Sequence, residues 1–194
     1  MSRPSFEDLD APMEPLETTG EPVMVFYDCE FTDLTTDSDL LSIGFVSSDC
    51  DAELYIEISD AQVQLSSFFV KEEVLPKFGT HNPEVLTRDH AALRIQAWLD
   101  DLRGRDRNRQ LVLVSDSTWD WNHLLELYIP IPGDPPWARS FNLVGRMVQN
   151  LMHPQRAEAF ERELALYHRQ HKQQHHALVD TRALKHAFWE SKWA

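Results

Sequence analysis

The sequence predicts an α/β domain built on a mixed five-stranded sheet with helices on both faces. Two observations lead to this fold class. Three strand-like segments follow one another early in the chain, at residues 23–27, 40–47 and 52–58, and helical and strand patterns alternate after them. A meander followed by such alternation is typical of a mixed sheet covered by helices, and not of a barrel or a sandwich.

Each element follows from a local pattern. The apolar run at residues 23–27 is β-branched and aromatic, which suits a strand buried on both faces. The polar quartet 48–51 predicts a hairpin turn between the second and third strands. Apolar residues at helical spacing predict a helix at 89–103. The remaining elements are a strand at 110–115, a helix at 119–128, a proline-rich loop at 129–137, a short apolar segment at 141–148, and helices at 155–169 and 177–192.

The length of 194 residues favours one folded domain, at 22–194, behind a flexible acidic tail at 1–21. The longest uninterrupted apolar run has five residues, whereas a membrane span needs about 20, which argues against a transmembrane enzyme. The first residues lack the apolar core of a secretory signal. We therefore expect a cytoplasmic protein with no membrane partner, whose two cysteines are reduced thiols.

Charge is distributed unevenly along the chain. The net charge is −14, and residues 1–70 hold 16 acidic side chains against one basic side chain. Such an acidic third can be a solvating tail, a surface that faces a protein, or a cluster of carboxylates that a bound metal neutralises.

Two acids close the first predicted strand. Asp28 and Glu30 are two residues apart, so their side chains share one face. Two like charges beside a hydrophobic strand are costly unless a cation or hydrogen-bond donors compensate them. The alternative is that the strand ends there and both acids are solvated.

Two further motifs stand at element boundaries. Asp116 and Asp120 follow a buried strand, at the end where sites gather in open α/β sheets. Asp116 could instead be an ordinary helix N-cap, and Asp120 a first-turn acid. His175 and Asp180 flank the start of the last helix; the alternative is a surface histidine and an acid that favours the helix dipole.

Together the three motifs resemble the DEDDh 3'-to-5' exonucleases, the superfamily of ribonuclease T, oligoribonuclease and the proofreading subunit of bacterial DNA polymerase. The resemblance spans roughly residues 23–190 and is greatest to the small bacterial and phage exoribonuclease branch first described from mycobacteria. It implies a ribonuclease H-like fold. One position departs from the pattern, because Asp116 stands where many relatives have Asn. The matching residues are Asp28, Glu30, Asp120, His175 and Asp180.

The resemblance implies two ions, Mg²⁺ or Mn²⁺, held by the four carboxylates, with His175 taking a proton from the attacking water. The implied activity is release of nucleoside 5'-monophosphates from RNA 3' ends. Phe31 and Leu34 would line the substrate pocket, and Trp119 would stack on the terminal base or simply pack in the core. A DNA exonuclease with the same site, or a noncatalytic nucleotide-binding or scaffold domain on this fold, are the alternatives. Dimers are common among similar enzymes, so the resemblance also allows a homodimer.

Two basic or histidine-rich stretches allow other interpretations. His168, His171, His175 and His176 could gather around a structural zinc ion, or form a solvated connector. The arginines that alternate in 103–109 could follow a phosphate backbone, or belong to a solvated turn.

Overall fold

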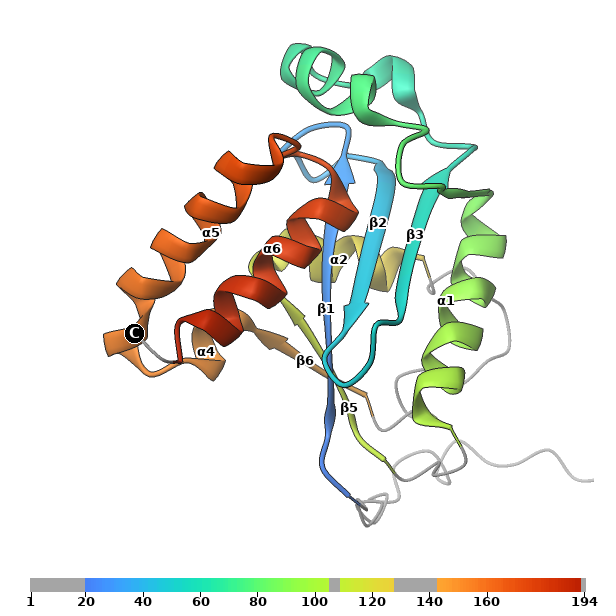
Figure 1. Ribbon diagram of the computed structural model, residues 1–194. Helices are drawn as coiled ribbons and strands as arrows, with labels where there is room; N and C mark the ends of the chain where they lie inside the picture. Colours follow the sequence, from blue (N-terminus) through green and yellow to red (C-terminus); the bar gives the residue numbers. More distant parts are fainter. Residues whose placement is uncertain (1–19, 105–108, 128–142, 193–194) are drawn as a thin grey trace, which may run out of the picture.

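A twisted mixed sheet runs through the centre of the molecule (Figure 1). The computed structural model describes residues 20–104, 109–127 and 143–192, so nearly all of the predicted tail and the proline-rich loop lie outside the described residues. The strands follow the order β4-β3-β2-β1-β5-β6. They are β1 (Val23–Phe31), β2 (Leu40–Ser47), β3 (Glu53–Ile58), β4 (Glu84–Leu86), β5 (Leu111–Ser115) and β6 (Leu143–Met147).

The predicted mixed sheet is confirmed, but the predicted number of strands is wrong, since the described part of the chain contains six. The additional strand is β4, which pairs in parallel with β3 at the edge of the sheet. It has only three residues, too few for a periodic pattern to be read from the sequence. The hairpins β1–β2 and β2–β3 are antiparallel, whereas β5 is parallel to both β1 and β6.

Helices cover both faces of the sheet, as the sequence predicts. On one face α1 (Arg88–Arg103) and α2 (Thr118–Glu126) contribute to the larger hydrophobic core. On the other face α4 (Val148–Leu151), α5 (Ala157–His171) and α6 (Ala177–Glu190) enclose a second core around Phe26 and Val114. In Figure 1, α6 crosses in front of the central strands and α5 lies outside it. None of the described helices is long and apolar enough to cross a membrane.

The central strand β1 sends alternate side chains to the two cores. Tyr27 and Cys29 join the larger core, and Phe26 joins the core beneath α6. Asp28 and Glu30 continue the series begun by Phe26, because side chains two apart in a strand share a face. The strand therefore does not end at Tyr27, as the apolar run predicted, but carries both acids within it.

The start of α6 lies directly on β2 at Gly44. A Cβ atom added at Gly44 would stand 2.6 Å from the Cα atom of Leu178, so only glycine allows this approach. The Thr181 hydroxyl donates to the Gly44 carbonyl oxygen at 3.1 Å. Gly44 is also the cross-strand partner of Asp28. This packing brings the first turn of α6, with Asp180, beside the acids of β1.

Short helical turns lie beyond the carboxyl end of β1, between β3 and β4 (Figure 1). They are η2 (Val63–Leu65), the π-helical η3 (Val70–Val74) and η4 (Leu75–Lys77). Val70 and Val74 are buried against Leu41 of β2. The connection between β3 and β4 thereby forms a wall over the end of the sheet that carries the acids.

Candidate metal and nucleotide site

The two acids of β1 are partly buried and face α6. Burial raises the pKa of Asp28 well above its usual range, and the charges of Asp120, Asp180 and Glu30 raise it further. The pKa of Glu30 is raised in the same way, first by burial and then by Asp180, while Lys77 acts in the opposite direction. Because β1 continues to Phe31 and both acids are partly buried, the alternative of two freely solvated acids at a strand end is wrong.

Asp120 reaches the same place from the first turn of α2. Its side chain is only 1% exposed, and the Cys29 thiol donates to its backbone carbonyl oxygen at 3.8 Å. Among the described residues the Oδ2 atom of Asp120 has no hydrogen-bond partner. Burial and the nearby Asp116 raise the pKa of this carboxyl group. A buried carboxylate oxygen without a donor is a strong candidate for a metal ligand.

The loop before α6 supplies His175 and holds Asp180. The His175 backbone N–H donates to Oδ2 of Asp180 at 2.8 Å, and His175 adopts a φ of 65°. The other oxygen, Oδ1, lies 3.4 Å from Nδ1 of His168 on α5. Burial raises the pKa of Asp180 to about 7, although the backbone donors of His175 and His176 oppose the rise. Asp180 is thus both a first-turn acid and a member of the acidic cluster.

The acids and His175 form two triads that could each hold a metal ion. One triad is Glu30, His175 and Asp180, and the other is Asp28, Asp116 and Asp120; within each, one ligand atom per residue lies within 4.8 Å of the others. Carboxylate-rich donor sets suit Mg²⁺ or Mn²⁺. The residues present could therefore hold metal ions of the kind that the resemblance implies.

Asp116 is a candidate ligand that the sequence analysis placed at a strand end where sites gather, but not among the residues that match the exonuclease motifs. The actual N-cap of α2 is Ser117, whose hydroxyl accepts from the Trp119 backbone N–H at 3.1 Å, so the N-cap interpretation of Asp116 is wrong. Asp116 instead places its carboxylate near those of Asp28 and Asp120. Its place directly after β5 was the available signal, because ligands gather at that end of a parallel strand.

The four clustered histidines do not converge on one ion. His176 is 2% exposed and packs against the rings of Tyr55 and His81, with centroids 4.5 and 4.7 Å away. His171 stacks on Tyr167, His168 lies beside Asp180, and His175 belongs to a triad. Within the described ranges no group of three imidazoles is close enough to share a metal, which argues against the structural zinc alternative.

Two cavities meet at the triads. The smaller, of about 460 Å³, is lined by Phe31, Leu34, Phe69, Val70 and Val74 together with the acids. The larger, of about 850 Å³, lies between η4 and α5 and shares Asp28, Phe69, His175 and Asp180 with the smaller one. Both volumes fall in the range of small-molecule sites.

Two of the three predicted substrate contacts line the smaller cavity. Phe31 and Leu34 do so, and the Leu34 side chain is 71% exposed. Trp119 does not line it. Its ring lies 6.3 Å from that of Phe31 and lines a separate hollow of about 270 Å³ with Ser38 and His123. Trp119 therefore lies beside Phe31 but outside the smaller cavity.

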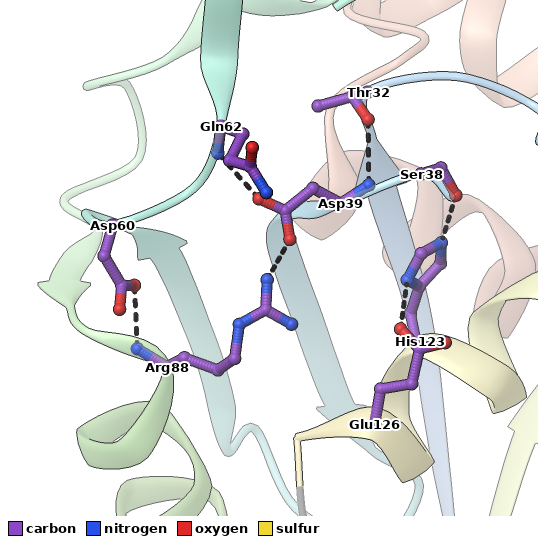
Figure 2. Close-up of polar contacts among 8 residues, drawn as sticks. All are labelled: Thr32, Ser38, Asp39, Asp60, Gln62, Arg88, His123 and Glu126. Atoms are coloured by element: carbon purple, nitrogen blue, oxygen red, sulfur yellow. Dashed lines mark hydrogen bonds and ion pairs between the residues drawn. The ribbon is translucent and has the colours of Figure 1, made fainter. Parts of the chain in front are cut away.

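Polar contacts fix the loop that follows Phe31 (Figure 2). Asp39 forms an ion pair with Arg88 and accepts from the Gln62 backbone N–H at 2.6 Å. Its own N–H donates to the Thr32 hydroxyl at 2.8 Å. Next to it, the Ser38 hydroxyl meets Nε2 of His123 at 3.0 Å, and the His123 ring stacks on Phe31. The loop is thereby tied to both α1 and α2, which holds Phe31 in place.

Arg103 and Arg109, the described arginines of 103–109, lie away from this site. Arg103 is 4% exposed in the last turn of α1, and Arg109 pairs with Asp49 at 2.8 Å. Gln110 accepts a hydrogen bond from the first residue of β1, so Arg109 lies at the end of the sheet opposite the acids. The other two arginines of this stretch lie outside the described residues.

Comparison of the sequence with models of protein families gives no match, and comparison with curated proteins gives no significant match.

Proposed function

We propose that this protein is a metal-dependent 3'-to-5' exoribonuclease that releases nucleoside 5'-monophosphates. The observation that carries the proposal is the pair of adjacent ligand triads at the mouth of an apolar cavity. A two-ion site is suited to in-line displacement at a phosphodiester, and an apolar cavity is suited to a nucleobase.

The five clustered carboxylates would hold the ions, which leaves the imidazole of His175 free to act as a base. When bound, Mg²⁺ or Mn²⁺ would supply Lewis acidity to the phosphodiester and increase the acidity of water. Burial raises the pKa of every acid in the cluster, and bound cations would favour the ionised carboxylates. The clustered acids are Asp28, Glu30, Asp116, Asp120 and Asp180.

His175 is the candidate general base. Burial and the charge of Lys77 lower its pKa, so the imidazole is neutral and able to accept a proton at pH 7. The contact between its backbone and Asp180, together with the edge of the Phe69 ring at a centroid distance of 4.9 Å, restricts its position. The proton of the attacking water would move to this ring as the bond to the leaving 3' oxygen breaks.

The smaller cavity would hold the terminal nucleobase. Phe31, Leu34 and Phe69 offer apolar and aromatic surface to either face of a base, and such stacking is worth about 1–3 kcal/mol per base. Because these contacts do not depend on a base-edge pattern, we expect little discrimination among bases from them.

The experiment that tests the proposal is digestion of matched RNA and DNA oligomers labelled at the 5' end. We expect RNA to shorten one nucleotide at a time from its 3' end in Mg²⁺ or Mn²⁺, and no digestion in excess chelator. Asp28→Asn should abolish digestion, whereas Asp49→Asn, at the far end of the sheet, should not. Faster digestion of DNA would replace RNA by DNA as the substrate. Binding of nucleoside monophosphate without any digestion would favour the noncatalytic alternative.

A further inference from the structure

The two cavities that meet at the triads have different linings. Outside the triads, the smaller cavity is mainly apolar. Outside the triads, the larger one is lined by three cations, Lys77, Arg169 and Lys172, against two acids, Glu73 and Glu161. A path with a surplus of cations leads from the acidic cluster toward the carboxyl end of α5.

The three cations lie on opposite walls of the larger cavity. Lys77 ends η4 on one wall, and Arg169 and Lys172 stand at the exposed end of α5 on the other. Within the described ranges none of the three forms an ion pair, whereas Arg88, Arg94 and Arg182 each pair with an acid. These charges are therefore available to an anionic ligand.

The helix dipole gives part of an alternative explanation. Cations in the last turn of a helix are favourable by about 0.3–1 kcal/mol each, which would account for Arg169 and Lys172. It does not account for Lys77, which faces them from another element and is close enough to the acids to lower the pKa of Glu30.

We propose that the larger cavity carries a single strand of nucleic acid on the 5' side of the cleaved bond, with its phosphates at Lys77, Arg169 and Lys172. This proposal rests on the proposed function, which puts the terminal base in the smaller cavity. Phe69 lines both cavities. The nucleic-acid strand would therefore pass the Phe69 ring at the junction between its terminal nucleotide and the nucleotides that precede it. The enzyme would then favour substrates long enough to reach α5 over dinucleotides.

The test compares Arg169→Ala/Lys172→Ala with Arg162→Ala. Arg162 is a matched control because it stands on the same helix, is exposed, and pairs with Glu163 away from the cavities. The first measurement is kcat/KM for an RNA octanucleotide and for the dinucleotide with the same 3' end. The second is the affinity for a 5'-fluorescein octanucleotide, by anisotropy at several salt concentrations with Ca²⁺ in place of Mg²⁺.

We expect the double variant to lower the ratio of octanucleotide to dinucleotide kcat/KM about tenfold. Each lost phosphate contact should make the slope of log affinity against log salt shallower by ~0.7, so the loss of two contacts should make it shallower by about 1.4. The control should match the wild type in both. Equal losses on the two substrates, or no loss on either, would overturn the proposal. The binding measurement does not depend on hydrolysis. A salt-dependent loss of affinity in a protein that digests nothing would therefore refute the proposed function and leave the strand path standing.

Discussion

Replacing Asp180 by Asn should make the fold more stable in the absence of metal and reduce its stabilisation by metal. Burial raises the pKa of Asp180 from 3.8 to about 7, so the folded chain holds a proton that the unfolded chain releases. The stability that depends on this proton is complete below about pH 4 and is lost as the pH rises through 7. In chelator, the wild type should therefore become less stable between pH 5 and pH 8.

The size of the effect follows from the pKa. A rise from 3.8 to about 7 corresponds to about 4 kcal/mol at pH 8. Because the neighbouring acids titrate together with Asp180, we expect one substitution to recover about half of this free energy, or ~2 kcal/mol. This corresponds to a shift of about 4–8 °C in the thermal midpoint. The amide introduced by the substitution would keep an oxygen for the His175 backbone N–H. In chelator at pH 8 the Asp180→Asn variant should therefore be more stable than the wild type.

Metal should reverse this order. A ligand present at 100 times its Kd stabilises the folded state by ~2.7 kcal/mol, so saturating Mg²⁺ should raise the midpoint of the wild type by about 5–10 °C. The variant lacks one ligand of a triad and should gain much less. The assay is thermal unfolding at pH 5 and pH 8, in chelator and in Mg²⁺, with Asp49→Asn as the control. A less stable variant in chelator at pH 8, or an equal gain from Mg²⁺, would refute this reasoning.

Three further changes test particular residues. His175→Ala should lower kcat by about 100-fold or more, while the Mg²⁺-induced rise in thermal midpoint persists. His176→Phe keeps an aromatic ring between Tyr55 and His81 and should change kcat little. The reverse ranking of the two variants would move the base to His176. Asp116→Asn should weaken Mg²⁺ binding measured by calorimetry, and unchanged binding would remove Asp116 from the triad. Gly44→Ala should lower the thermal midpoint, because its Cβ atom would collide with the backbone of α6; an unchanged midpoint would show that α6 shifts freely.

The order of elements could be predicted because it rests on local patterns. The apolar run of β1, the hairpin turn and the spacing of the helices are all visible in the sequence. The end of β1 could not be predicted in the same way. Glu30 remains in the strand because it pairs with Ser42 of β2, and this pairing depends on another segment of the chain. The short strand β4 likewise exists through its pairing with β3.

The site was predictable where its residues lie close in sequence to element ends. Asp28 and Glu30 share a face through the two-residue period of a strand, and the structure brings them together with Asp120, His175 and Asp180. The contact between His168 and Asp180 was not predictable, because the packing of α5 against α6 brings the two side chains together. The same holds for Lys77, whose position depends on the fold of the connection between β3 and β4.

Hydrolysis at the 3' end of a strand, directed by the two triads, is tested most directly by the fate of the attacking water. The measurement is mass spectrometry of the products from an RNA octanucleotide digested in ¹⁸O-labelled water with Mg²⁺. We predict nucleoside 5'-monophosphates that each carry one ¹⁸O atom in the phosphate, and no products in chelator. Nucleoside 3'-monophosphates, unlabelled phosphate, or an intact octanucleotide in Mg²⁺ would contradict the proposed reaction.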